Sequence, residues 1–263
     1  MTSAIDANRV AALADVLIEA RTTRRALDPL PAELVPTSEA EAAAVDDRVA
    51  EVTGWTVKGW KIGCTSKHAQ EMLGAPGPFA GRVYSLFEGD ATLGPDELVA
   101  EPNLEGEFAF TLGVDLAPRT GGHGGDDVVA AIATIHPAIE VVGGRFAQFV
   151  GTPLLCLVAD AGANTHLVLG PPAPSWDPDS LSTTAATIEV DGEVTGRGTG
   201  ADVLGGPITA LGWLVDHLTE RGITLEAGQV VTTGTATQVS ALPVGATATA
   251  TLDGIGSVSL TRR

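Results

Sequence analysis

Residues 101–110 read Glu-Pro-Asn-Leu-Glu-Gly-Glu-Phe-Ala-Phe, and this segment predicts a β-strand with two chemically different faces. Side chains alternate between the faces of a strand, so Glu105 and Glu107 lie together on one face. Phe108 and Phe110 fall on the opposite face. One face of the predicted strand is therefore acidic and the other is apolar.

A third carboxylate lies in a second predicted strand, where residues 136–142 read His-Pro-Ala-Ile-Glu-Val-Val. Glu140 is flanked by Ile139 and Val141, which favour burial. Three clustered carboxylates repel one another and cost several kcal/mol each to desolvate, and a bound divalent cation removes that problem. Taken alone, Glu105 and Glu107 also fit a solvated face of an edge strand, so Glu140 is what favours a metal site.

The composition limits the class of protein. The chain has 263 residues, 44% of them hydrophobic, which allows a substantial core. A net charge of −18 argues against nucleic acid or an anionic membrane as a partner. Cys64 and Cys156 do not form a metal-binding spacing, and no basic segment followed by an apolar stretch begins the sequence. We therefore expect a cytoplasmic protein.

The periodicity predicts one integrated α+β unit, with neither a tandem repeat nor a sharp linker. Asp191-Gly192 is a typical hairpin turn between two short strands. Helices are expected at 5–26, 37–53, 66–73, 126–135 and 206–218. Strands are expected at 54–64, in several pieces over 81–113, and at 137–142, 154–160, 167–169, 186–190, 193–194, 229–234, 246–252 and 256–261.

Eight segments, in the same order, match one family. They include Trp-Lys-Ile-Gly-Cys-Thr-Ser at 60–66, Glu-Gly-Glu-Phe-Ala-Phe at 105–110 and Pro-Ala-Ile-Glu-Val-Val at 137–142. The others lie at 198–207, 210–214, 222–228, 230–235 and 256–259. From about residue 10 onward, the chain resembles the 2-keto-4-pentenoate hydratase and 4-oxalocrotonate decarboxylase group of the fumarylacetoacetate hydrolase superfamily.

The resemblance implies a mixed β-roll of the fumarylacetoacetate hydrolase C-terminal type with N-terminal helices. In this arrangement, a helical segment, 1–75, packs on a catalytic body, 76–263, in a single integrated domain. It also implies homo-oligomeric assembly and Mg²⁺ or Mn²⁺ held by Glu105, Glu107 and Glu140. The oxygen-only ligand set independently supports a hard cation.

The implied activity is hydration of a 2-hydroxy-2,4-dienoate or 2-oxo-alkenoate through a metal-bound enolate, as in the degradation of aromatic compounds. A 2-oxo acid chelates a divalent ion, which stabilises the negative charge of its enolate. A decarboxylase of the 4-oxalocrotonate type would generate the same enolate by loss of CO₂. Hydrolysis of an acylpyruvate C–C bond is a further alternative, although the expected catalytic histidine has no clear match. A catalytically altered relative, which binds an acid or supports a neighbouring pathway enzyme, is the last.

Two residues are candidates for catalysis. Lys61 is the active-site lysine that the resemblance implies, and it either binds the substrate carboxylate or moves protons. Without the motif it would be an ordinary exposed lysine. Asp160 is a candidate general acid or base, or a residue that orders water. It also fits a simple cap before the turn at Gly162.

Three further residues are candidates for substrate binding. Thr235, beside a glycine, is predicted to hydrogen-bond a substrate carboxylate, although it also fits a plain turn. Arg82 is predicted to bind a distal acidic group, and Ser85 belongs to the same neighbourhood. Here the chain reads Tyr84-Ser85 where the family usually has an acidic residue nearby. It also reads Ala161 where relatives commonly have asparagine, and Asn164 follows three residues later.

Overall fold

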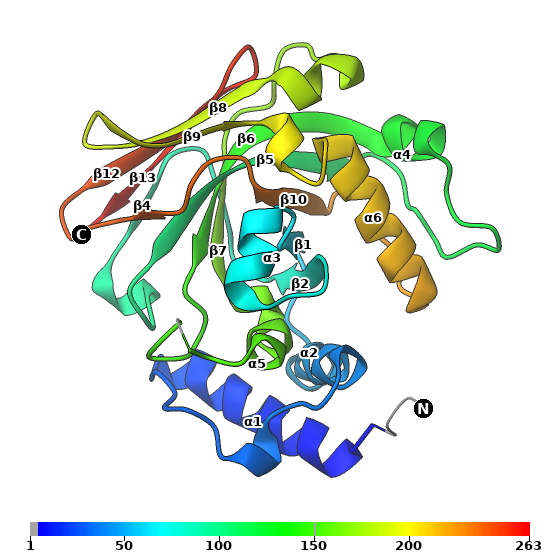
Figure 1. Cartoon of the computed structure of the whole chain (residues 1–263), viewed down its shortest axis with the longest axis vertical. Helices are drawn as coiled ribbons and strands as arrows, with labels where there is room; N and C mark the ends of the chain where they lie inside the picture. Colours follow the sequence, from blue (N-terminus) through cyan, green and yellow to red (C-terminus); the bar gives the residue numbers. More distant parts are fainter. Residues whose placement is uncertain (1–4, 150) are drawn as a thin grey trace.

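The computed structural model describes residues 5–149 and 151–263, and it consists of two β-sheets with helices at one end and one side (Figure 1). The predicted α+β class is confirmed. None of the described helices combines the length and the apolar character that a bilayer-spanning segment requires. The helices are α1 (Ala7–Thr23), α2 (Glu39–Thr53), α3 (Lys67–Leu73), α4 (Gly125–Ala131), α5 (Leu154–Ala159) and α6 (Pro207–Glu220).

Side-chain caps explain where the first three helices begin. The Asp6 carboxylate accepts hydrogen bonds from two backbone N–H groups of α1, and Ser38 and Ser66 cap α2 and α3 in the same way. Such caps satisfy N–H groups that have no partner within the helix. The helix starts are therefore determined by residues close to them in the sequence.

The larger sheet contains the strand from which the sequence analysis began, β5 (Asn103–Leu112). β5 lies between β10 (Val230–Thr235) and β6 (Ile132–Val142), so the interpretation of Glu105 and Glu107 as an edge-strand face is wrong. Beyond β10 come β1 (Gly59–Gly63) and β2 (Phe79–Val83), and beyond β6 come β7 (Asn164–Leu169) and β3 (Leu86–Glu88). The short β11 (Ser240–Ala241), which was not predicted, also pairs with β5.

The smaller sheet packs against one part of the apolar face of the larger sheet. Leu104, Ile139 and Val141 of the larger sheet share a buried core with Ile188 and Val258 of the smaller one. Its strands, in spatial order, are β4 (Ala91–Leu93), β13 (Gly256–Arg262), β12 (Thr247–Leu252), β8 (Ala185–Val190) and β9 (Glu193–Thr199). The predicted hairpin turn lies between β8 and β9, with positive φ angles at Asp191 and Gly192.

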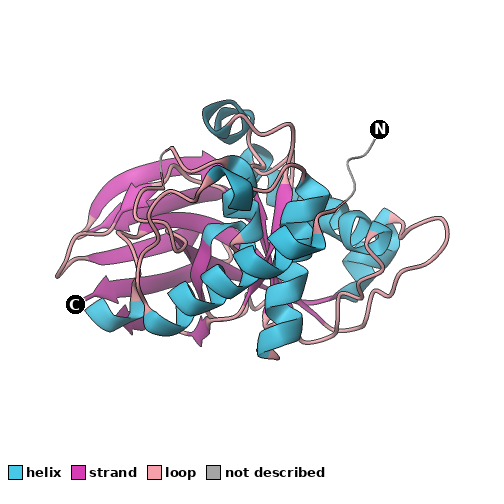
Figure 2. Ribbon diagram, turned by 90° about the horizontal axis from the view of Figure 1, so that it is seen from below, coloured by secondary structure: helices cyan, strands magenta, loops and turns pink. Residues whose placement is uncertain are grey.

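Two groups of helices cover the rest. Phe108 and Phe110 pack with Leu211 and Leu214 of α6, which lies beside β10 in Figure 1. Helices α1, α2 and α5 form a separate apolar cluster at the opposite end from the smaller sheet. The view from below shows helices in front of the strands (Figure 2).

The sequence interpretation of residues 154–160 as a strand was wrong, because residues 154–159 form helix α5. Cys156, Leu157, Val158 and Ala159 are all buried, so the run is apolar on every side and shows no period that separates helix from strand. The helix predicted over 126–135 ends at Ala131 because the residues that follow pair with β5. Strand β1 pairs with β10 and β2, which connects the predicted N-terminal segment directly to the larger sheet.

Candidate metal centre

One face of the larger sheet collects the predicted ligands. Glu105 pairs directly with Glu140 across β5 and β6, so the two side chains lie on the same face. Glu107 is two residues further along β5 and shares that face. One carboxylate oxygen from each of the three residues lies within 4.8 Å of the other two. The structure therefore brings together the three glutamates that the sequence proposed.

Burial gives these carboxylates unusual electrostatics. The side chains of Glu107 and Glu140 are 0% exposed. Burial, reinforced by the charge of Glu140, raises the pKa of Glu105 to about 7, and Lys61 acts in the opposite direction. Burial and the two neighbouring glutamates likewise raise the pKa of Glu107 well above its ordinary value. A cluster of this kind is costly without a compensating cation.

The donor set fits a divalent cation on two observations. Glu107 Oε1 and Glu140 Oε2 are buried and have no hydrogen-bond partner among the described residues. Buried polar atoms normally have partners, so these two oxygens are available to a ligand. All three donors are carboxylate oxygens, which suit Mg²⁺ or Mn²⁺ better than softer metals.

Lys61 lies on the same sheet face as the glutamates, and its Nζ is 3.4 Å from Glu140 Oε1. It is buried, and its Nζ is 5.4 Å from the centre of the Phe79 ring. Burial lowers the pKa of Lys61, but the three glutamates raise this pKa by more than burial lowers it. The net shift is therefore upward. Its cross-strand partner is Gly81, where a Cβ atom would be 2.1 Å from the Ala161 carbonyl oxygen. Only glycine fits there without displacing the backbone.

Asp160 is held by arginines that the sequence analysis did not identify. Arg145 Nε donates to both carboxylate oxygens, at 2.6 and 2.9 Å, and Arg21 Nη2 lies 3.3 Å from Oδ1. The backbone N–H of Arg145 also donates to Oδ2. The alternative of a side-chain cap has no support, because Asp160 makes no capping hydrogen bond within the residues that the structure describes. These contacts favour a structural role, and the predicted role in proton transfer stays a prediction.

Arg82 does not reach the glutamates. Its cross-strand partner is Trp60, so it lies on the face opposite Lys61. There it forms ion pairs with Asp46 at 2.5 Å and Asp47 at 2.6 Å, and its guanidinium covers the Trp60 ring. The prediction that Arg82 binds a distal acidic group is therefore at odds with its position, which fastens β2 to α2.

Of the other two predicted substrate contacts, Thr235 lies beside the metal centre, whereas Ser85 contacts a residue on the opposite face of the sheet. The Ser85 hydroxyl pairs with His166 Nδ1 at 2.7 Å, and His166 lies on the face opposite Glu140 because it pairs with Val141. Thr235 is directly opposite Glu107 across β10 and β5, next to the metal centre. Its hydroxyl donates to the Thr237 carbonyl oxygen, so Thr235 both borders the site and shapes a turn.

Two polar contacts to the glutamates were not predicted. The backbone N–H of Gly234 donates to Glu107 Oε2 at 2.9 Å, and Asn164 Nδ2 donates to Glu140 Oε1 at 2.9 Å. The only sequence signal for Asn164 was its position close to a site where relatives commonly have asparagine. No sequence signal indicates which N–H group would reach a glutamate, because both contacts cross between strands.

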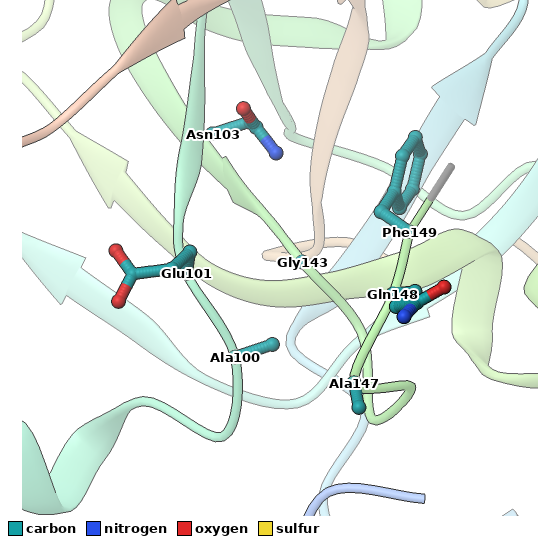
Figure 3. A pocket seen from close by; sticks show the side chains of 7 residues that line it. All are labelled: Ala100, Glu101, Asn103, Gly143, Ala147, Gln148 and Phe149. Carbon is teal, nitrogen blue, oxygen red and sulfur yellow. The ribbon is translucent and has the colours of Figure 1, made fainter. Parts of the chain in front are cut away.

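A cavity of about 350 Å³ is lined in part by the start of β5. Asn103, which is two residues before Glu105 on β5, forms one side, and Gln148 and Phe149 form another (Figure 3). Residues two apart on a strand are separated by about 7 Å, so Asn103 lies roughly that far along β5 from Glu105. Ala100, Glu101, Gly143 and Ala147 complete its lining.

Comparison with known proteins agrees with this geometry. A family model described as Fumarylacetoacetate (FAA) hydrolase C-terminal matches residues 57–261. A 2-keto-4-pentenoate hydratase of Burkholderia vietnamiensis (strain G4 / LMG 22486) is 34% identical over 261 residues, which cover 97% of this chain and 98% of that protein. A 4-oxalocrotonate decarboxylase of Pseudomonas putida is 31% identical over 80% of this chain and 78% of its own length.

A solved structure matches nearly the whole fold. The 4-oxalocrotonate decarboxylase from Pseudomonas putida G7, complexed with magnesium and adipate, superimposes with a TM-score of 0.87. The two chains are 26% identical, and the match covers 99% of each. The sequence and the structure are thus similar to two kinds of enzyme.

Proposed function

This chain belongs to the fumarylacetoacetate hydrolase family, and we propose that it is a metal-dependent hydratase of a 2-hydroxy-2,4-dienoate. The observation that carries the proposal is the group of three glutamates with Lys61 beside it on one sheet face. Similarity to a 2-keto-4-pentenoate hydratase over 97% of the chain supports the hydratase reaction. Its substrate class is that of an intermediate in aromatic-compound degradation.

Glu105, Glu107 and Glu140 would hold Mg²⁺ or Mn²⁺, which supplies positive charge where negative charge develops on the substrate. Lys61 Nζ would donate a hydrogen bond to a substrate oxygen or transfer a proton to it, and its position beside Glu140 supports this role. Thr235, opposite Glu107, is a proposed contact for the substrate carboxylate.

The surroundings of the site also suit a small, largely apolar acid. Beyond Glu107 on the same face, Ala109 and Ala138 belong to a buried apolar cluster that excludes water from that side. The cavity beside Asn103 and Phe149 could receive the end of the substrate remote from its carboxylate.

A decarboxylase is the second candidate, because the solved decarboxylase matches 99% of the chain. Its dicarboxylic substrate would need a cationic partner for the second carboxylate. Arg82, the residue predicted for that task, is already paired with Asp46 and Asp47. The pairing of Arg82 therefore favours the hydratase. A C–C hydrolase is the third candidate. His136 and His166 of the larger sheet contact Gly170 and Ser85, and His68 is exposed on α3.

The test is turnover of 2-hydroxypenta-2,4-dienoate with Mg²⁺ or Mn²⁺. We expect loss of the conjugated absorbance and formation of 4-hydroxy-2-oxopentanoate, identified by mass. Glu107→Gln should abolish both turnover and the metal-induced rise in melting temperature, whereas Glu193→Gln, on exposed strand β9, should change neither. Release of CO₂ from 2-oxohex-3-enedioate without hydration of the dienoate would instead establish the decarboxylase. Metal binding without either reaction would indicate a catalytically altered relative.

The assembly and the cellular location are also proposals. We propose a homo-oligomer, following the family resemblance, and light scattering of the purified chain measures its size directly. Co-purification tests association with a neighbouring pathway enzyme. Both cysteines are free and buried, which agrees with a reducing cytoplasm. We further propose that residues 1–75 fold together with the body, since β1 is part of the larger sheet.

A further inference from the structure

The two oxygens of the Glu140 carboxylate have different environments. Oε1 accepts a hydrogen bond from Asn164 Nδ2 at 2.9 Å and lies 3.4 Å from Lys61 Nζ. Oε2 is buried and has no partner among the described residues. A carboxylate held through one oxygen presents the other in a defined direction.

Glu107 is divided in the same way. Its Oε2 accepts from the backbone N–H of Gly234, and its Oε1 has no partner in the described part of the chain. A residue with a side chain could not easily replace Gly234, because φ is +95° and a Cβ atom would be 2.1 Å from Thr65 Oγ1. The protein thus uses one oxygen of each buried glutamate to fix its orientation.

Asn164 is itself firmly fixed. The residue is buried, and its backbone carbonyl oxygen accepts from Arg145 Nη1 at 2.8 Å. Arg145 is in turn held by the Asp160 carboxylate and carbonyl oxygen. The backbone that carries the Asn164 amide group is therefore held in place beside Glu140. An amide N–H donates at any pH, so this hydrogen bond does not depend on a protonation state of the asparagine.

We propose that Asn164 is a positioning residue that holds Glu140 Oε1 so that Oε2 faces the cation of the metal centre. This inference rests on the metal site in the proposed function, but not on the reaction. The inference also assigns different effects to Asn164 and Lys61, the two groups next to Glu140 Oε1. Asn164 orients the ligand with a directional bond, whereas Lys61 adds a positive charge that opposes cation binding. Removal of Asn164 and removal of the Lys61 charge should therefore change metal affinity in opposite directions.

The experiment is a titration of the purified full chain with Mn²⁺, without substrate, followed by calorimetry and by the electron paramagnetic resonance signal of free Mn²⁺. We expect Asn164→Ala to weaken Mn²⁺ affinity by roughly 10- to 100-fold, the usual effect of losing a hydrogen bond that orients a metal ligand. Lys61→Met should bind Mn²⁺ more tightly than the parent and lose turnover. The control is Ser240→Ala, which removes a buried hydroxyl that pairs with Thr195, and it should retain the parent affinity.

A second variant, Asn164→Ser, keeps a small polar group while removing the amide, and circular dichroism shows which variants fold. If the folded Asn164 variants bind Mn²⁺ as tightly as the parent, the inference is overturned. The inference is also overturned if Ser240→Ala weakens Mn²⁺ binding as much as the Asn164 variants do. Failure of the proposed reaction has a different signature: the parent binds Mn²⁺ and Asn164→Ala weakens it, but the dienoate is unchanged.

Discussion

At the scale of single residues, Arg145 explains the position of Asp160. The arginine side chain is buried, and its guanidinium donates to both carboxylate oxygens and to the Asp160 carbonyl. Breaking a buried ion pair by removing one partner is strongly destabilising, because the remaining charge is left without compensation. The effect of Asp160 on stability can therefore be measured separately from its effect on catalysis.

We expect Asp160→Asn to lower the free energy of unfolding by about 3–5 kcal/mol, measured by urea denaturation. The double variant Asp160→Leu with Arg145→Met should recover much of this loss, since neither charge is then buried alone. A folded Asp160→Asn protein with unchanged stability and no turnover would contradict the structural role and support the proton-transfer role.

A buried histidine gives a pH dependence whose sign is fixed. His136 Nδ1 donates to the Gly170 carbonyl oxygen, while Nε2 is available to accept from the hydroxyls of Thr134 and Thr111. Burial lowers the pKa of His136 below its ordinary value of 6.5, although Gly170 acts in the opposite direction. The unfolded chain therefore binds a proton more readily, and stability is lost as the pH falls below about 6.5.

Substituting His136 should flatten this part of the stability curve. We expect the loss of melting temperature between pH 7.5 and pH 5.5, values on either side of roughly 6.5, to be smaller for His136→Asn than for the parent. His68→Asn, which removes an exposed histidine on α3, is the control and should follow the parent. Identical pH profiles for the parent and His136→Asn would contradict the prediction.

At the scale of elements, close backbone packing brings β2 against the turn that follows α5. A Cβ atom at Gly81 would lie 2.1 Å from the Ala161 carbonyl oxygen, which belongs to that turn. We expect Gly81→Ala to destabilise the protein by about 1–3 kcal/mol or more, because the backbone must move. The displacement would also disturb Lys61, which is the cross-strand partner of Gly81.

Gly212 provides the matched control, because it lies in α6 and a Cβ atom added there would have open space around it. Gly212→Ala should raise the free energy of unfolding by roughly 0.5–1 kcal/mol, since alanine has a higher helix propensity than glycine. Denaturant unfolding of the two variants measures the contrast. Equal effects at both positions would show that close packing at Gly81 has no energetic consequence.

At the scale of the whole molecule, the net charge of −18 opposes compaction. Salt screens this repulsion, with a Debye length of about 10 Å at 0.1 M. We expect the melting temperature to rise between roughly 0.05 and 0.5 M NaCl in the parent and in Glu107→Gln alike. The further rise caused by Mg²⁺ at constant ionic strength should occur only in the parent. A melting temperature independent of NaCl would show that the charge is already balanced locally.

Local sequence was sufficient to predict the helices that begin next to Ser38 and Ser66, the β8–β9 hairpin and the two faces of β5. These features depend on residues close together in the chain. Through the ordered motifs the sequence also indicated the family and the three glutamates. The helix at 154–159 could not be predicted, because a run that is apolar on every side has no hydrophobic periodicity to distinguish a helix from a strand.

The meeting of polar groups, in contrast, depends on the folded chain. Arg82 was assigned to a substrate from its neighbourhood in the sequence, yet strand pairing turns it toward Asp46. Asn164 reaches Glu140, and Arg145 reaches Asp160, because contacts between strands and turns depend on register and side-chain direction. The sequence therefore specifies which carboxylates can bind a cation, whereas the packing of distant segments determines which of their oxygens are free to do so.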